Sequence, residues 1–321
     1  MKDIQKRIGD AGIVPVIKIN DPDKAVPLAK ALYDGGLPIA EITFRTSHAK
    51  EAIARITAEV PEMLVGAGTV LTTDQVDAAI EAGAKFIVSP GFNQDVVRHC
   101  IDREITVTPG CVTPSDIERA ISFGVNVVKF FPAEAYGGVK TIKALSAPYP
   151  GIKFIPTGGI DSSNLISYLS HEKVLACGGS WMVKEEFINN GEFDKIKSLV
   201  KEAVDVMLGF EAAHIGINML SAEEAGEVAG AFERTFGLKV KDGNSSFFAG
   251  PNIEVMKSPF LGMHGHIAIG TNSVARAVSY LKRQGVEFMD NTAKYDEKGN
   301  LQSIYLKKDA GGFAIHLVQK K

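Results

Sequence analysis

Short apolar runs alternate with amphipathic segments between residue 13 and about residue 180. The runs are rich in β-branched residues, which favour strands. The amphipathic segments, such as residues 21–36 and 72–84, carry apolar residues at helical spacing, an N-cap candidate (Asp21 or Thr73) and a terminal glycine. The pattern therefore predicts strands that alternate with helices. The predicted strands cover residues 13–17, 38–44, 63–68, 85–90, 105–110, 126–131, 153–159 and 173–179.

Eight nearly continuous apolar strands separated by helices are typical of a parallel (β/α)8 barrel, because its strands are buried on both faces. An open, doubly wound sheet is the alternative, but it ordinarily uses fewer strands and binds its ligand at one switch point. The number of strands therefore favours an α/β fold of the TIM-barrel type. Residues 192–208 are predicted to form the closing helix, which Gly209 ends.

The pattern changes after residue 209. A strand (214–220), a helix (221–237) and a hairpin made by SSFFAG and NIEVMK are followed by a second strand (266–270), a helix (272–285) and the strands LQSIYL and GFAIHLV. The order βαββ or βαβββ thus occurs twice, with a period of roughly 50 residues. We predict a barrel domain over residues 1–208 and a smaller α+β domain of paired βαβββ modules over residues 212–321.

Composition excludes several classes of partner. The chain is 45% hydrophobic and has a formal net charge of -3, which provides no broad attraction for nucleic acid or for an anionic membrane. Its three cysteines, Cys100, Cys111 and Cys177, form no CxxC pair and do not indicate a disulfide framework. The N-terminus lacks the apolar core of a signal peptide, and no apolar run approaches the roughly 20 residues that cross a bilayer. We predict a soluble, cytoplasmic protein.

One predicted strand contains a lysine. In VNVVKFFPAE, residues 125–134, Lys129 lies among valine and phenylalanine side chains. Burial disfavours the charged amine and should lower its pKa, and a neutral amine can attack a ketone to form a Schiff base. The alternative is a lysine whose stem lies along the strand end and whose ammonium group reaches water.

Other candidate residues lie at the C-terminal ends of predicted strands, where barrels place their active sites. Glu41 is either a structural partner of a nearby amine or a general base. Arg45 can pair bidentately with a carboxylate or simply face solvent. The glycine pairs in TGG (157–159) and GGS (178–180) either expose backbone N–H groups to a phosphate or make tight turns.

Seven motifs follow one another in the first domain: GIVPVI, EITFRT, GAGTV, SPG, VKFFPAE, TGGI and GGSW. Over residues 8–205 they resemble the 2-keto-3-deoxy-6-phosphogluconate aldolases, many of which also act as 4-hydroxy-2-oxoglutarate aldolases. The resemblance implies a keto-acid substrate, no metal for the aldolase reaction and a homotrimer. It also implies the following roles: Lys129 as Schiff-base lysine, Glu41 as general base, Arg45 and Thr69 on the pyruvate carboxylate, Pro90 and Phe131 as pocket walls, and Gly158, Gly159 and Ser180 on the phosphate.

The implied reaction is a class I retro-aldol cleavage, a step of the Entner–Doudoroff pathway. Lys129 condenses with the C2 ketone, and Glu41, acting through a water, removes the C4 hydroxyl proton. The C3–C4 bond then breaks, glyceraldehyde 3-phosphate leaves, and the pyruvate enamine is protonated and hydrolysed. Cleavage of 4-hydroxy-2-oxoglutarate would release pyruvate and glyoxylate in the same way.

Four of the seven histidines follow residue 213. His214, Glu254, His266 and His316 occupy related positions in the two repeated units and could converge on one divalent metal, although strand-edge histidines are often only half-exposed. Through HIGIN, NIEVM and HIAIG, residues 212–319 resemble the glyoxalase/dioxygenase (vicinal oxygen chelate) superfamily. In that superfamily these four positions hold the metal ligands. The last is more commonly glutamate, and His264 is a nearby substitute.

Two other functions remain open at this stage. The barrel could cleave the galactonate epimer of the substrate, which differs only at the carbon that bears the C4 hydroxyl. Alternatively, the chain could be a non-catalytic sensor, with a decayed barrel beneath a metal-binding or small-molecule-binding domain. The intact set of Glu41, Arg45, Thr69 and Lys129 argues against decay.

Overall fold

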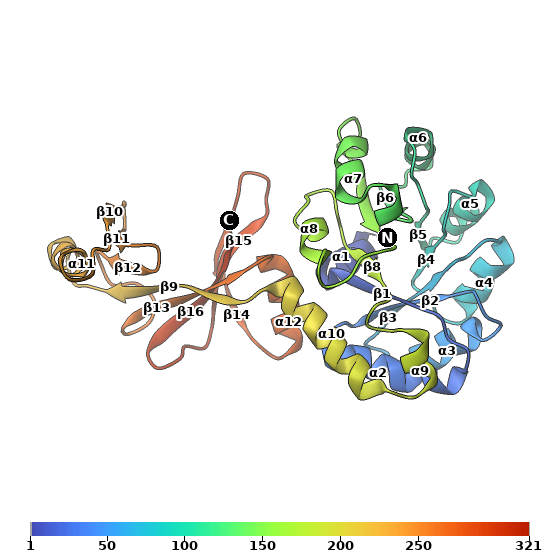
Figure 1. Ribbon diagram of the computed structural model, residues 1–321, viewed down its shortest axis with the longest axis horizontal. Helices are drawn as coiled ribbons and strands as arrows, with labels where there is room; N and C mark the ends of the chain where they lie inside the picture. The colour runs from blue at the N-terminus through green and yellow to red at the C-terminus, as the bar shows by residue number, and fades with distance from the viewer. Residues whose placement is uncertain (1, 321) are drawn as a thin grey trace. The chain divides into compact units, whose positions relative to one another are not determined.

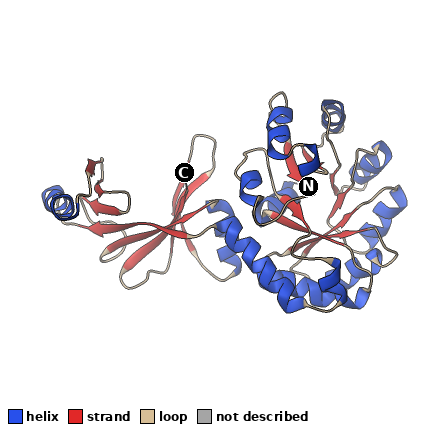
Figure 2. Ribbon diagram, in the orientation of Figure 1, coloured by secondary structure: helices blue, strands red, loops and turns tan. Residues whose placement is uncertain are grey.

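A computed structural model describes residues 2–320 of the chain. The chain divides into two compact units, and the boundary lies between Met207 and Leu208 (Figure 1). Helices and strands alternate through the first unit, whereas strands dominate the second (Figure 2). Each unit is described by itself.

The first unit contains eight short strands, each followed by helical segments. The strands are β1 (Ile13–Ile17), β2 (Ile39–Thr43), β3 (Leu64–Gly68), β4 (Phe86–Val88), β5 (Thr106–Thr108), β6 (Val127–Phe130), β7 (Lys153–Pro156) and β8 (Cys177–Gly179). The helices are α1 (Lys2–Ala11), η1 (Pro22–Lys24), α2 (Ala25–Gly35), α3 (Ala49–Glu59), α4 (Thr73–Glu81), α5 (Gln94–Asp102), α6 (Pro114–Ser122), η2 (Glu134–Tyr136), α7 (Gly138–Ser146), α8 (Leu165–Leu169), α9 (Glu185–Asn189) and α10 (Phe193–Leu208).

These strands form a curled parallel sheet with helices on its outer side (Figure 1). Six strands pair in the order β5-β4-β3-β2-β1-β8, and β6 pairs with β7. Single parallel bridges, Gly110 to Lys129 and Thr157 to Gly178, join β6 to the end of β5 and β7 to β8. The predicted parallel α/β architecture of this unit is therefore confirmed.

Apolar side chains fill the interior of the curled sheet at its amino-terminal end. Ile39, Leu64, Phe86 and Val127 belong to one buried cluster, and α1 adds Ile8, which is 1% exposed. The period-2 geometry of strands directs alternate side chains to this interior. The helix α1 closes the layer below the sheet, so polar groups deeper in the interior are cut off from water on that side.

The starts of the helices differ slightly from the predicted ones. Thr72, not Thr73, caps α4, because its side chain accepts a hydrogen bond from the amide of Gln75 at 3.2 Å. Asp21 caps the short helix η1 and accepts from the amide of Asp23 at 3.0 Å. Thr72 and Thr73 are adjacent, so the sequence alone does not show which hydroxyl accepts from the free backbone amides of the first helical turn.

The second unit is mostly sheet. Its eight strands pair in the order β10-β11-β12-β9-β13-β16-β15-β14. Along the chain the elements are β9 (Glu211–Asn218), α11 (Ala222–Phe236), β10 (Val240–Asp242), β11 (Ser246–Ala249), β12 (Ile253–Met256), β13 (Gly265–Thr271), α12 (Val274–Arg283), β14 (Phe288–Tyr295), β15 (Leu301–Leu306) and β16 (Phe313–Gln319).

Four strands lie at the centre of that sheet. β12 runs parallel to β9, β9 runs antiparallel to β13, and β13 runs parallel to β16. The sheet thus joins two segments that are about 50 residues apart in the sequence. Within residues 2–320, no helix combines the length and the apolar character needed to cross a membrane.

The helix α6 leads directly into the strand that carries Lys129, and a capping box starts it. The Thr113 hydroxyl accepts from the amide of Asp116 at 3.2 Å, and the Asp116 carboxylate accepts from the amide of Thr113 at 3.1 Å. We expect Thr113→Ala to lower the free energy of unfolding by about 1 kcal/mol. The amide of Asp116 loses its acceptor, and the Asp116 carboxylate loses the hydroxyl that helps to hold it at the amide of residue 113. Urea unfolding followed by the fluorescence of Trp181, the one tryptophan of the sequence, measures this. Thr113→Ser is the control and should unfold like the wild type; equal loss in both variants contradicts the capping role.

Candidate functional site

A lysine and a glutamate form a buried ion pair inside the first unit. The ammonium nitrogen of Lys129 on β6 lies 3.3 Å from Oε1 of Glu41 on β2, and the side chains are only 7% and 4% exposed. The alternative that the Lys129 ammonium group reaches water at the strand end is therefore wrong. A buried carboxylate beside a buried amine can stabilise the amine or exchange protons with it.

Two glycines of β3 make room for Glu41 and for the neighbouring ring of Phe86. A Cβ atom on Gly68 would lie 2.2 Å from Oε1 of Glu41, and one on Gly66 would lie 2.3 Å from the ring of Phe86. Next to Lys129 and Glu41 there is a space of about 10 Å³, bounded also by Thr108 and Thr157. Such a space is near the minimum for one water molecule.

Arg45 and Thr69 come together beside the pair. Nε of Arg45 donates to the Thr69 hydroxyl across 3.3 Å. Thr69 has φ of 54°, a left-handed conformation that costs a β-branched residue about 1 kcal/mol or more, so its surroundings hold it there. Phe131 lies on the other side, with its ring centre 5.5 Å from the Lys129 ammonium nitrogen.

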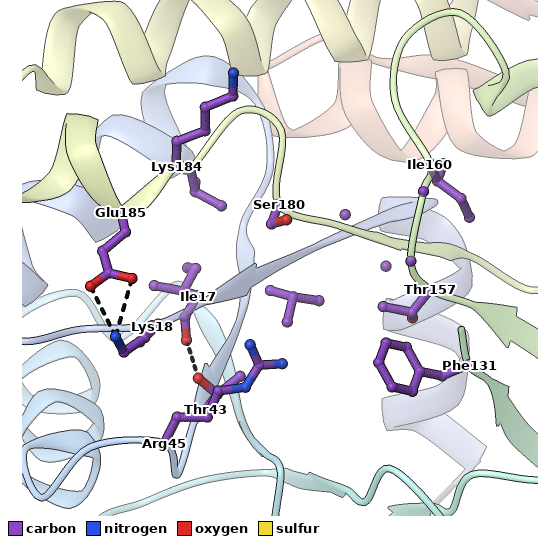
Figure 3. Close-up of a pocket in the computed structure, with 16 residues that line it drawn as sticks. Ile17, Lys18, Thr43, Arg45, Phe131, Thr157, Ile160, Ser180, Lys184 and Glu185 are labelled. Atoms are coloured by element: carbon purple, nitrogen blue, oxygen red, sulfur yellow. Dashed lines mark hydrogen bonds and ion pairs between the residues drawn. The ribbon is translucent and has the colours of Figure 1, made fainter. Parts of the chain in front are cut away.

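A cavity of about 460 Å³ lies at the carboxyl ends of the strands (Figure 3). Lys129 and Glu41 are not among the residues that line it, but Thr157 borders both this cavity and the small space beside the pair. The walls of the larger cavity include Arg45, Phe131, Gly158, Gly159 and Ser180. Both glycines have positive φ, 101° and 78°, so the TGG turn needs them. The volume lies in the range of sites for small molecules.

The glycine turn is held from below by two of its neighbours. The amide of Glu134 donates to the carbonyl of Gly158 at 3.1 Å, and a Cβ on Gly159 would lie 2.6 Å from Cγ of Glu134. The buried hydroxyl of Tyr168 donates to the Glu134 carboxylate. Burial, and to a lesser extent this hydrogen bond, raises the pKa of Tyr168. The turn therefore has a rigid support.

The other predicted residues differ in their positions. Pro90 lies outside the residues that line the cavity, and its carbonyl packs against Gly110, where a Cβ would meet it at 2.0 Å. Thr69 reaches the cavity only through Arg45. Sequence reasoning missed Lys18 and Glu185, which line the cavity and pair with each other at 2.9 Å. Lys18 directly follows the first predicted strand, so the rule that barrels place sites at strand ends could have identified it.

Three histidines and a glutamate meet in the second unit. The Nε2 atoms of His214 and His266 lie 3.1 Å apart, and they lie 3.2 Å and 3.1 Å from Oε2 of Glu254. One ring nitrogen from each of His214, His266 and His316 lies within 4.8 Å of the others. All four predicted ligand positions therefore fall in one cluster.

The sheet register explains this cluster. Ala268 on β13 faces His214 on one side and His316 on the other, while His266 and Glu254 flank Gly216 in the neighbouring row. Residues opposite one another and two apart share a face of the sheet. Gly216 is required there, because a Cβ on it would lie 2.1 Å from the His266 ring.

His264 does not belong to this cluster. Its ring packs on Phe313 at 5.6 Å between centres, and it lies against Gly312. It is two residues from His266 but in the turn before β13 begins. His264 therefore does not substitute for His316.

The charges of the cluster are unevenly balanced. Burial alone would raise the pKa of Glu254, but hydrogen bonds from His214, His266 and Ser246 outweigh burial and hold that pKa well below its usual range. Burial, together with His266 and His214, lowers the pKa of His316 to about 3. His316 is thus a neutral imidazole, which is the form that binds metals.

Two ring nitrogens of His316 and Nδ1 of His266 are buried without a hydrogen-bond partner. The ring of Tyr305 stacks on His316, with centres 4.6 Å apart and planes inclined by 16°. Buried polar atoms without partners are uncommon and need an explanation, which a bound group can supply. Three imidazoles and one carboxylate are a donor set that suits a divalent transition metal.

Comparisons with known proteins concern the first unit. Residues 4–199 match the family model "Aldolase: KDPG and KHG aldolase". The 2-dehydro-3-deoxy-phosphogluconate aldolase of Treponema pallidum (strain Nichols) is 48% identical over 195 residues, which are 61% of this chain and 93% of that protein.

Two solved structures are also similar. A KDPG aldolase from Legionella pneumophila, with pyruvate captured as a covalent carbinolamine intermediate, is 38% identical with a TM-score of 0.61, over 62% of this chain and 97% of that one. The 2-keto-3-deoxy-6-phosphogluconate aldolase of Zymomonas mobilis ZM4 with 3-phosphoglycerate is 40% identical with a TM-score of 0.59, over 63% and 95%.

The close approach of Gly68 to Glu41 can be tested without any substrate. We expect Gly68→Ala to lower the free energy of unfolding of the first unit by about 3 kcal/mol, because the new methyl group pushes the carboxylate away from Lys129 and leaves a buried charge unpaired. Urea unfolding followed by Trp181 fluorescence measures the change. Gly91→Ala is the matched control, since a Cβ there meets nothing within 4 Å. Equal stability of the two variants contradicts the packing described above.

Proposed function

The chain belongs to the KDPG and KHG aldolase family. We propose that its first unit is a class I aldolase and that this unit has the (β/α)8 barrel fold. The substrate is 2-keto-3-deoxy-6-phosphogluconate, cleaved to pyruvate and glyceraldehyde 3-phosphate, and 4-hydroxy-2-oxoglutarate is a second substrate. The observation that carries the proposal is the buried Lys129 amine, 3.3 Å from the Glu41 carboxylate. Thr43 and Phe131, at the ends of the same two strands, line a cavity of about 460 Å³.

The reaction uses Lys129 first. Its amine adds to the C2 ketone, and loss of water gives an iminium ion. Glu41, through one water, removes the C4 hydroxyl proton, and the electrons of the C3–C4 bond pass to the iminium, so that the aldehyde leaves and an enamine remains. Return of the proton to C3 and hydrolysis of the iminium then release pyruvate and restore the free amine of Lys129.

The remaining residues position the substrate in this proposal. Arg45, braced by Thr69, binds the keto-acid carboxylate, and Phe131 bounds the apolar side of the reacting carbons. The amides of Gly158 and Gly159, with the Ser180 hydroxyl, bind the phosphate. Pro90 acts by shaping the turn next to Gly110. A homotrimer and a cytoplasmic location stay predictions.

Borohydride trapping with pyruvate tests the proposed chemistry. We expect a reduced pyruvate adduct on the peptide that contains Lys129, because borohydride reduces the iminium irreversibly. Intact mass and peptide mapping read the result, and Lys129→Ala should form no adduct and retain essentially no cleavage while remaining folded. Glu41→Gln should still form adduct but cleave about 10²–10⁴-fold more slowly. Absence of an adduct in folded wild-type protein would assign Lys129 a structural role.

The galactonate epimer remains the competing substrate. Because the two compounds differ only at C4, the ratio of their kcat/KM values decides between them. A non-catalytic sensor is opposed by the intact pair of Glu41 and Lys129 and by the cavity at the carboxyl ends of the strands. Turnover of neither compound would favour the sensor.

For the second unit we propose a divalent metal held by His214, Glu254, His266 and His316. The family match ends at residue 199, so the likeness of residues 212–319 to the glyoxalase/dioxygenase superfamily stays a prediction. The unpartnered nitrogens of His316 and the low pKa of Glu254 support the donor set. A bound divalent metal would supply a Lewis acid there.

Metal titration of protein that has been stripped with a chelator tests this site. We expect one Co²⁺ or Zn²⁺ per chain, and Glu254→Gln should weaken binding about 100-fold because the site then lacks its only carboxylate. Calorimetry and the visible spectrum of Co²⁺ measure both effects. His264→Ala is the control and should bind like the wild type, since that ring lies outside the cluster. Equal affinity of wild type and Glu254→Gln rules out the proposed ligands.

A further inference from the structure

The cavity of the first unit carries a charged pair that the proposed mechanism does not use. Nζ of Lys18 lies 2.9 Å from Oε1 and 3.2 Å from Oε2 of Glu185, and both residues line the cavity (Figure 3). Lys18 directly follows β1, and Glu185 begins α9. Neither belongs to the motifs of the family resemblance. The pair therefore raises the question of what a cation does at this wall.

The sheet places Lys18 at the end of the strand beside the one that leads to Ser180, one of the residues proposed for the phosphate. Thr157 and Ile160, which flank the two phosphate glycines, lie on the opposite wall (Figure 3). β1 runs beside β8 with Pro15 opposite Gly179, so the chain beyond β1 rises next to Ser180. Ile17, Lys18 and Ser180 all face the same cavity. Lys18 thus presents a cation to the cavity itself, whereas the buried Lys129 amine is not among the residues that line it.

Glu185 is anchored by a second donor. The amide nitrogen of Asn20 donates to the same Oε1 across 2.5 Å. Hydrogen bonds from Asn20 and then Lys18 lower the pKa of Glu185, so the carboxylate is ionised at neutral pH. Glu185 is therefore a fixed anion, whereas Lys18 ends on a flexible four-carbon stem.

The pair is weak enough to be exchanged. The side chains of Lys18 and Glu185 are 37% and 43% exposed, and ion pairs with this exposure contribute little to stability. A phosphate monoester carries nearly two negative charges and three acceptor oxygens, so it competes well for the ammonium group. Lys18 can move from Glu185 to such a group by rotation of its own side chain.

Of the other two cations that line the cavity, Arg45 is proposed for the keto-acid carboxylate and Lys184 points elsewhere. Arg45 bonds to Thr69 near the reacting centre. Lys184 lies with its ammonium nitrogen 5.7 Å from the Phe187 ring centre and points away from Arg45 (Figure 3). Among the described residues of this wall, Lys18 is the cation best placed for a distal anion.

We propose that Lys18 selects substrates with a distal phosphate, and that Glu185 sets the strength of this selection by competing for the same ammonium group. The inference rests on the proposed aldolase function. The phosphorylated sugar acid extends to the wall that holds Lys18, whereas 4-hydroxy-2-oxoglutarate lacks both the phosphate and the carbon atoms that would carry it there. The pair thus discriminates between the two substrates without touching the reacting carbons.

Steady-state kinetics on both substrates test the proposal. Lys18→Met raises KM for the phosphorylated substrate about tenfold, the loss of one charge-assisted hydrogen bond, and leaves its kcat and the KM for 4-hydroxy-2-oxoglutarate within about twofold. Glu185→Gln lowers KM for the phosphorylated substrate by about two- to threefold, because the competing charge is gone. Lys18→Arg restores most of the selectivity.

Lys184→Met is the matched control, since it removes the same charge from the same wall and leaves both KM values unchanged. An equal change in KM for the two substrates in Lys18→Met, or no change for either, overturns the proposal and reduces the pair to a surface ion pair.

A binding measurement separates this proposal from the aldolase function. Inorganic phosphate, titrated by calorimetry, needs no turnover and binds about tenfold more weakly to Lys18→Met than to wild type or Lys184→Met. If wild type shows neither cleavage nor a borohydride adduct, the aldolase function fails, but the phosphate titration still decides the role of Lys18. Equal phosphate affinity in all three proteins overturns that role.

Discussion

The pairing of one amine and one carboxylate inside an apolar sheet is the constraint on which the first unit depends. Either charge alone would be costly to bury, by several kcal/mol, so Lys129 and Glu41 must meet. They come from β6 and β2, strands 88 residues apart in sequence, and Gly68 must lack a side chain for the carboxylate to fit. The apolar layer formed by Ile8 and Phe86 closes the site from below, and the cavity opens on the other side. The same geometry that stabilises the fold keeps the proposed nucleophile out of water, with its proposed acid–base partner beside it.

The second unit solves a related problem with different residues. One carboxylate, Glu254, accepts hydrogen bonds from two imidazoles, while His316 has no partner and remains neutral. Buried ring nitrogens of His316 and His266 without hydrogen-bond partners lower the stability of the folded state. A metal ion would offset this loss. The charges of the first unit balance within the buried pair, whereas the proposed cation would balance those of the second unit, which is why the proposals for the two units differ in kind.

Much of the architecture could be predicted from periodicity. The eight strands of the first unit lie within or very near the predicted runs, because β-branched residues buried on both faces leave a clear signal. The predicted ends of the elements were less accurate. Thr72 and not Thr73 caps α4, and β9 begins at Glu211, three residues before the predicted strand. The strand β14 was not identified by its own run, since FMDNTAKY has polar residues throughout and is only half-buried. Edge strands of this kind lack the alternation on which prediction depends.

By itself the sequence determined the types of residue at the strand ends, and with them the candidate amine, the candidate base and the candidate ligands. A lysine among valines and phenylalanines in one strand needs a partner or a function. Three histidines and a glutamate at related positions of a repeated pattern indicate a shared site. Only the tertiary structure decided the partners. Lys129 pairs with Glu41, and Lys18 pairs with Glu185, which is 167 residues away in the sequence. The register of three strands places His214 and His316 on either side of Ala268. Such pairings follow from sheet order and register, which are set by the packing of the whole unit and not by any local pattern.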